Sequence, residues 1–209
     1  DQKETMKFID TEERLLRPEN LVKGSPGKGF NIYKSKNNKK VAVINLMGNI
    51  FMKKCDDVFE AAKKFKIKSM FKGVAIRPGK PIMFAKLNNN MCFFGLPGNP
   101  ISSAACFRFF ILPFLFKSLG ITFEKPIIAR LKYKFKKKKK FTRFIKGKLI
   151  FTRKGESVFE VIEGQESYKI KSFTKSNAWG VFKSGTSEYK KGSYIECHSL
   201  SGLNEFLMD

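Results

Sequence analysis

The chain has 209 residues, of which 42% are hydrophobic, enough to bury the core of one large domain or two small ones. Its formal net charge of +24 invites a nucleic-acid-binding function, but dispersed, solvated lysines are the favoured explanation of such a charge. The four cysteines are widely spaced and form no Cys-x-x-Cys pair, which excludes a thiolate zinc site of that type and fits a reducing cytoplasm.

The first third of the sequence alternates helix and strand patterns. Residues 2–9 predict a helix end, and the apolar run Val41 to Leu46 has the length of a buried strand. The stretch "DDVFEAAKKFKI" begins with aspartates and repeats apolar residues at helical spacing, and "GVAIR" after it is strand-like. The N-terminal residues lack the order of a secretory signal, so we expect no export.

Two strand-like segments, "PIMFAKL" and "MCFFGL", follow and predict a hairpin that ends at a Pro-Gly-Asn-Pro corner. Ser102 and Ser103 lie where a helix would be capped, and Ala104 to Leu119 supply its body. Residues 101–116 are apolar, but Arg108 and Pro113 interrupt them, so we expect a buried helix and no membrane span.

After Pro126 the pattern changes to short strands broken by glycines, which predicts a small all-β barrel or sandwich. The densest basic run, Lys136 to Lys140, lies between two strand-like segments and is expected at a hairpin tip or sheet edge. A nucleic-acid-binding module built on this run is one alternative function, but arginine near aromatic residues is scarce.

Two Pro-Gly corners about twenty residues apart predict a binding site for an oxyanion or phosphate. Proline and glycine fix each corner, and the following helix start offers unpaired N–H groups and the positive end of the helix dipole. Arg77 and Lys80, at the first corner, would add a planar donor fork and a mobile point charge.

The segments "VAIRPGKPIMFAKL" and "FFGLPGNPISSAACF" resemble the core of the molybdopterin molybdenumtransferases, the family of MoeA and the gephyrin E domain. The resemblance runs over about residues 66–200 and includes "FTRFIKGKL" and "GQESYKIKSFTKSNAWGVF", which look like the family's C-terminal β-barrel. It implies the C-terminal part of a three-layer α/β molybdopterin-binding domain over residues 66–125 and the barrel over residues 126–200.

The resemblance also implies a reaction and a site. The family inserts molybdate into adenylylated molybdopterin and releases AMP with help from a divalent cation, expected to be Mg²⁺, and a homodimer is implied. Arg77 and Lys80 would hold molybdate or the cofactor phosphate as catalytic residues, and Asp57 would be a catalytic residue and metal ligand. The substrate-binding loops would consist of Gly79, Pro97, Gly98, Asn99, Pro100 and Ser102.

A second resemblance covers about residues 1–60. There "RPEN…GSPGKG…KVAVINLMGNIFM" resembles the YmdB-like calcineurin-type metallophosphoesterases, so residues 1–65 are expected to be a fragment of that family. Dinuclear phosphoesterases need several histidines, but this chain has one, His198, which we expect to be structural. A metal-dependent phosphodiesterase is therefore the second alternative function.

The two resemblances meet within residues 55–66, as a fusion or as an artefactual join of two fragments. The earlier half of the family's α/β domain does not occur in this sequence, so we expect a partial or hybrid copy with impaired catalysis.

Overall fold

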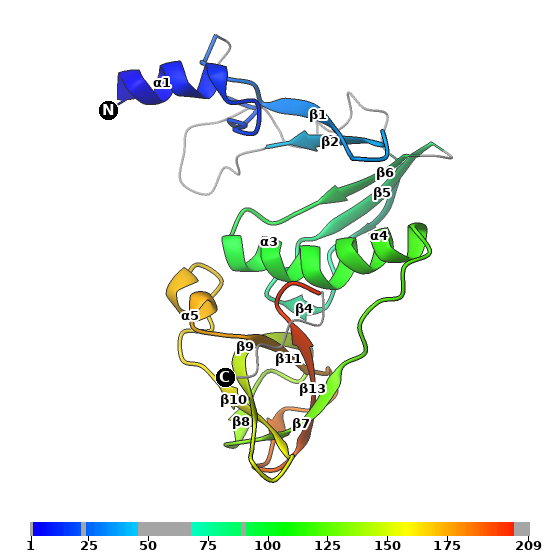
Figure 1. Ribbon diagram of the computed structural model, residues 1–209, viewed down its shortest axis with the longest axis vertical. Coiled ribbons are helices and arrows are strands. Elements are labelled where there is room, and N and C mark those ends of the chain that lie inside the picture. Colours follow the sequence, from blue (N-terminus) through cyan, green and yellow to red (C-terminus); the bar gives the residue numbers. More distant parts are fainter. Residues whose placement is uncertain (1, 22–23, 46–67, 89–90, 203–209) are drawn as a thin grey trace. The chain divides into compact units, whose positions relative to one another are not determined.

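The computed structural model describes residues 2–21, 24–45, 68–88 and 91–202 (Figure 1). The chain divides into two compact units, Asp1–Lys68 and Ser69–Asp209. The helix expected in "DDVFEAAKKFKI" and the end of the strand expected at Leu46 lie outside the described residues.

The first unit contains helix α1 (Gln2–Thr11) and an antiparallel hairpin of β1 (Phe30–Lys34) and β2 (Lys40–Ile44). Asp10 of α1 accepts a hydrogen bond at 2.6 Å from the N–H of Gly27, in the loop before β1. The Tyr33 hydroxyl donates to the Glu13 carbonyl at 2.6 Å, which holds the segment after α1 to the hairpin. The predicted helix and strand are confirmed, but the burial expected for the strand is wrong. Val41 is 51% exposed because a two-stranded ribbon leaves much of its surface open.

A three-stranded sheet follows, formed by β3 (Lys68–Lys72), which starts at the boundary of the two units, β5 (Met83–Asn88) and β6 (Met91–Gly95). The predicted hairpin is confirmed, because β5 and β6 pair antiparallel. The strand expected over "GVAIR" shortens to β4 (Ile76–Arg77), since Gly73 has a φ of 80° and the Val74 N–H bonds to the Lys80 carbonyl at 2.9 Å. Residues 73–82 therefore form a closed loop.

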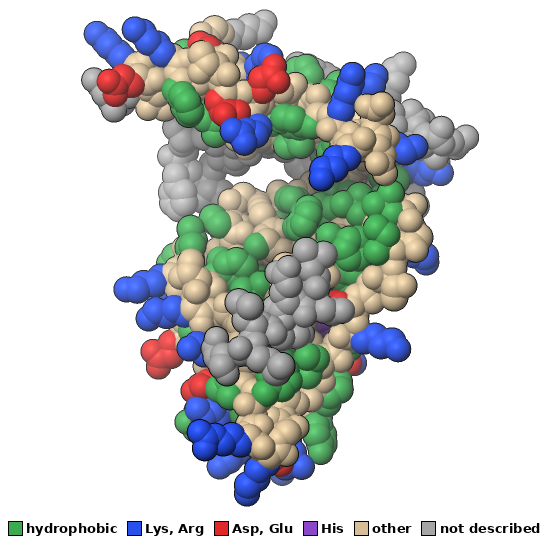
Figure 2. All heavy atoms as spheres, in the orientation of Figure 1, with side chains coloured by type: hydrophobic (Ala, Val, Ile, Leu, Met, Phe, Trp, Pro, Cys, Tyr) green, Lys and Arg blue, Asp and Glu red, His purple; other side chains and the backbone are tan. Residues whose placement is uncertain are grey.

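One helical run of 19 residues follows, Pro100–Ser118. It consists of α3 (Pro100–Cys106), a π-helical turn η1 (Phe107–Ile111) and α4 (Leu112–Ser118). By length and composition it could cross a membrane, but a core helix passes the same test. The burial expected for the whole helix is found mainly in α3, where Ile101, Ala105 and Cys106 are buried, and is wrong for α4, which has no buried residue. Figure 2 shows hydrophobic side chains gathered over α4 on the face in view. Phe114 and Leu115 of α4 are exposed.

The remaining strands form the predicted barrel. Its members are β7 (Ile127–Leu131), β9 (Thr142–Phe151), β10 (Ser157–Val161), β11 (Ala178–Phe182) and β13 (Tyr194–Ser199). They pair in the order β10, β7, β13, β11, β9, and the antiparallel pairing of β9 with β10 closes the circle. A short ribbon of β8 (Phe135–Lys136) and β12 (Glu188–Tyr189) and helix α5 (Ile170–Thr174) complete the unit. A closed barrel leaves no free strand edges within its circle.

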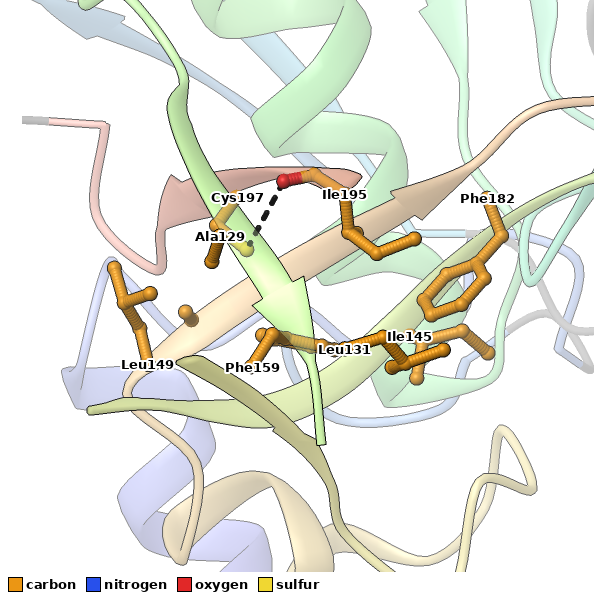
Figure 3. Packing of buried hydrophobic residues seen from close by; sticks show 9 residues of the cluster. Ala129, Leu131, Ile145, Leu149, Phe159, Phe182, Ile195 and Cys197 are labelled. Carbon is orange, nitrogen blue, oxygen red and sulfur yellow. Dashed lines mark hydrogen bonds between the residues drawn. The ribbon is translucent and has the colours of Figure 1, made fainter. Parts of the chain in front are cut away.

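Two hydrophobic clusters stabilise this unit. The first fills the barrel, where Leu131, Ile145, Phe159 and Phe182 point into one interior (Figure 3). The second lies between the helical run and the outside of the barrel, and it joins Ile101, Ala105 and Cys106 of α3 to residues of β9 and β11 that include Phe144 and Trp179. The Phe109 ring stacks on Phe144 at 3.9 Å between centroids. Residues of the two ranges expected as separate domains, 66–125 and 126–200, thus share one core. The domain limits and the three-layer α/β arrangement stay predictions.

Candidate functional site

The first Pro-Gly corner packs tightly against α3. The Arg77–Pro78 peptide bond is cis, and Gly79 is buried with a φ of 105°. A Cβ atom at Gly79 would lie 2.5 Å from the Cys106 sulfur, and the Cys106 thiol donates to the Gly79 carbonyl at 3.6 Å. Only glycine fits this position, both by backbone angle and by space. The first corner is therefore fixed on the helix that the second corner opens.

The second corner begins the helix earlier than the sequence predicts. Asn99, with a φ of −71° and a ψ of 127°, precedes the first helical residue, Pro100, which suits proline because that position needs no N–H. The expectation that Ser102 and Ser103 cap the helix is wrong. Ser102 lies inside the first turn and is 5% exposed, while the Ser103 hydroxyl donates to the Pro97 carbonyl.

The second corner forms hydrogen bonds with the loop that precedes α5. The Asn99 side-chain amide donates to the Ser167 hydroxyl at 3.1 Å, and the Ile101 N–H donates to the Ser167 carbonyl at 3.3 Å. Asn99 and Gly98 are exposed. The second corner therefore contacts the loop before α5, where the Asn99 side-chain amide lies next to the Ser167 hydroxyl.

Arg77 contacts a different set of residues. It pairs with Arg143 in the parallel register of β4 and β9, and its guanidinium carbon lies 4.7 Å from the centroid of the Phe141 ring. Together these residues line a hollow of about 370 Å³ with Lys136, Lys137 and Lys138. Lys80 is exposed at the other end of the first corner. Asp57 lies outside the described residues.

Lys146 of β9 is a buried residue that no sequence pattern indicated, and it is only 1% exposed. Its ammonium group donates to the Ser172 hydroxyl at 2.7 Å, to the Gly164 carbonyl at 2.8 Å and to two further carbonyls of the loop 164–169. Burial lowers the pKa of Lys146; the Glu166 charge opposes this shift, and the charges of Lys169 and Arg143 add to it. Alternation along β9 places Lys146 on the outer face with Phe144, but only the packed structure shows that helices cover this face.

A line of neighbouring groups thus connects the two corners. Arg77 pairs with Arg143 in the register of β4 and β9, and the charge of Arg143 contributes to lowering the pKa of Lys146. The Lys146 ammonium donates to the loop 164–169. This loop contains Ser167, whose hydroxyl accepts a hydrogen bond from the Asn99 amide. The structure joins Gly79 directly to α3, whereas it links Arg77 to Asn99 only through barrel residues. Convergence of Arg77, Lys80 and the Asn99 corner on one anion stays a prediction.

No group of three or more His, Cys, Asp or Glu side chains suited to a metal ion occurs within the described ranges. Asp57, the expected metal ligand, lies outside these ranges, so the magnesium site stays a prediction.

Comparison with known proteins separates the chain into two parts. Residues 1–75 match the YmdB-like protein family, and residues 128–200 match the MoeA C-terminal region, domain IV. Both resemblances are therefore confirmed.

Among curated proteins, residues of this chain are 44% identical over 72 positions to a 2',3'-cyclic-nucleotide 2'-phosphodiesterase of Bacillus subtilis, covering 31% of this chain and 27% of that protein. A molybdopterin molybdenumtransferase of Synechococcus elongatus is 28% identical over 161 residues, covering 77% of this chain and 39% of that protein. The same enzyme of Bacillus subtilis is 28% identical, with 76% and 37% covered. The chain thus spans well under half of these relatives.

Solved structures agree on the fold. A molybdopterin biosynthesis MoeA protein from Pyrococcus horikoshii superposes with a TM-score of 0.54 at 23% identity, covering 68% of this chain and 39% of that chain. A molybdenum cofactor biosynthesis protein from Pyrococcus furiosus has a TM-score of 0.51 at 24% identity, with 62% and 44% covered. The closed barrel described above agrees with the match to domain IV.

Proposed function

We propose that this chain acts in molybdenum cofactor biosynthesis and that residues 69–200 bind an oxyanion at the two Pro-Gly corners. The observation that carries the proposal is the packing of the first corner on α3, where Gly79 contacts Cys106, about two helical turns after the Asn99 corner. The match of residues 128–200 to the MoeA C-terminal region and the names of the relatives support the choice of substrate.

The finer proposal is the reaction that the resemblance implies: molybdate is inserted into adenylylated molybdopterin, and AMP is released. In it Arg77 and Lys80 hold molybdate or the phosphate, and Pro97, Gly98, Asn99, Pro100 and Ser102 shape the loop. A homodimer in the cytoplasm is part of the same proposal, as is the role of Asp57 with Mg²⁺. Since the chain spans 39% or less of the transferases named above, we expect slow turnover at most.

Molybdate binding by the full chain tests the oxyanion site. We expect saturable binding in isothermal titration calorimetry, and Lys80→Ala should weaken it about tenfold, because one charge-assisted contact is lost. Lys86→Ala is the matched control, since Lys86 is also exposed and lies on the neighbouring strand β5. Unchanged affinity in Lys80→Ala, or no binding by the parent chain, would overturn the assignment.

A second candidate rests on the match of residues 1–75 to the YmdB-like family and on the phosphodiesterase relative. Hydrolysis of a 2',3'-cyclic nucleotide with added Mn²⁺ tests it. With one histidine in the sequence we expect no hydrolysis above the protein-free blank, and a metal-dependent rate would favour this candidate.

A further inference from the structure

The outer face of the barrel carries a row of aromatic, cationic and aliphatic side chains that the proposed function does not use. The strand register places Tyr194 of β13, Arg130 of β7, Val158 of β10 and Ile150 of β9 side by side. Ala129, next to Arg130, belongs to the barrel core, so the row points outward. Tyr194 is 68% exposed and Ile150 is 38% exposed. At the usual spacing of strands, the row is about 14 Å long.

Two cations of this face lie against exposed aromatic rings. The guanidinium carbon of Arg130 lies 5.9 Å from the centroid of the Tyr194 ring, and the Lys132 ammonium lies 5.3 Å from that of Tyr133. Tyr133 is 60% exposed, so both rings remain largely open to solvent. Arg130 and Tyr194 are far apart in the sequence, and the folded barrel brings them together. The face thus offers two stacking surfaces, each beside a positive charge.

The acidic partners of these cations leave them available to an anionic ligand. Arg130 is 3.7 Å from Glu156, and both side chains are more than half exposed. Lys132 pairs with Glu160 at 3.0 Å, where both side chains are also reached by solvent. Exposed ion pairs of this kind contribute little stability, so a phosphate group can replace the carboxylate. Further exposed lysines border the row in β9 and in the turn before β13: Lys148, Lys190 and Lys191.

We propose that this outer face of the barrel binds single-stranded RNA. Bases stack on Tyr194 and Tyr133, because every base has a flat face, and the phosphates contact Arg130 and Lys132. The Glu160 carboxylate, on the same face, can accept a hydrogen bond from a 2′-hydroxyl, which DNA lacks, and this favours RNA over DNA. The net charge of +24 adds long-range attraction. The inference goes beyond the proposed function, because none of these residues belongs to the molybdate site.

Fluorescence anisotropy of the full chain with a labelled oligouridylate of about ten nucleotides tests this proposal. We expect saturable binding that weakens steeply as salt is added. Tyr194→Ala should weaken binding about tenfold, whereas Tyr194→Phe, which keeps the ring, should bind within about twofold of the parent. Arg130→Gln should weaken binding several-fold and make the salt dependence shallower. Both side chains are more than half exposed, so these variants should fold like the parent.

Lys138→Gln is the matched control for charge. Lys138 is exposed and belongs to the densest basic run, but it lines the hollow beside Arg143, at the other end of β9 from Ile150. Equal losses in Lys138→Gln and Arg130→Gln would show a diffuse basic surface and overturn the proposal. The proposal also fails if the parent chain shows no saturable binding, if Tyr194→Phe loses as much affinity as Tyr194→Ala, or if oligodeoxyuridylate binds as tightly as the RNA. Polyglutamate that competes as well as unlabelled RNA would show attraction by charge without stacking, with the same consequence. Molybdate binding at Lys80 is unaffected by any of these results.

Discussion

Arg108 is the most deeply buried charge of the helical run, with 2% of its side chain exposed. It forms an ion pair with Glu124, which is 1% exposed, and its Nε donates to the Ser199 carbonyl at 2.9 Å. Glu124 also accepts from the Ser199 hydroxyl at 2.7 Å. The guanidinium further lies over the rings of Phe109 and Phe123. These contacts fix the helical run to strand β13 of the barrel.

Replacing Arg108 with methionine should destabilise the fold by about 3–5 kcal/mol, because the Glu124 carboxylate would remain buried without its partner. The measurement is urea unfolding at pH 7. Arg130→Met is the control: its pair with Glu156 spans 3.7 Å and both side chains are more than half exposed, so the loss should stay below about 1 kcal/mol. Equal losses in the two variants would contradict the role assigned to burial.

His198 makes the stability of the barrel depend on pH. Burial, aided by the charge of Arg108, lowers the pKa of His198 from 6.5 to about 4, although Glu196 acts in the opposite direction. As the pH falls, His198 is therefore protonated in the unfolded chain at a higher pH than in the folded chain. The contribution is fully present above pH 6.5 and is lost as the pH falls from 6.5 to 4.

Between pH 7 and pH 5 we expect this group alone to remove about 2 kcal/mol from the free energy of unfolding. His198→Gln should abolish that part of the loss, which is measured as the difference between parent and variant in urea titrations at both pH values. A parallel decline in both proteins would show that His198 does not control the acid sensitivity.

At the scale of elements, the barrel depends on two glycines that make room for one ring. A Cβ atom at Gly180 of β11 would lie 2.6 Å from ring atoms of Phe159, and one at Gly147 of β9 would also overlap that ring and lie 2.6 Å from the Glu160 carbonyl. Phe159 itself is fully buried in β10. Strands β9, β10 and β11 can therefore close around this phenylalanine only without side chains at both positions.

Gly147→Ala should lower the melting temperature markedly, because the added methyl group overpacks the interior, at a cost of about 1–3 kcal/mol. Lys148→Ala, at the next residue of β9, is the control, since its side chain is exposed and should leave stability within about 0.5 kcal/mol. Circular dichroism melts of the three proteins provide the comparison. A melt of Gly147→Ala that overlays the parent would mean that Phe159 moves aside freely.

At the scale of the whole molecule, the sequence predicted the parts whose signals are local. The β5–β6 hairpin, the helical run and the barrel all follow from turn residues and apolar periodicity. The helix start moved from the serines to Asn99 because Pro100 suits the first helical position. Lys146 was missed because its environment arises when the helices cover one face of the barrel. Arg143 was missed because its neighbour Arg77 comes from β4, and no short pattern records such a long-range pairing.

The two compact units differ in how their unfolding can be observed. The single tryptophan of the chain, Trp179, is fully buried in the second unit, in the cluster shared by the barrel and the helical run. Tryptophan fluorescence therefore reports the second unit, whereas far-ultraviolet circular dichroism reports helices and strands of both.

We expect circular dichroism to show a transition of the first unit that tryptophan fluorescence does not follow, since each unit carries its own contacts. Arg108→Met should shift only the transition seen by fluorescence, because Arg108 belongs to the second unit. Coincident transitions that shift together in Arg108→Met would show that the two units unfold as one cooperative structure.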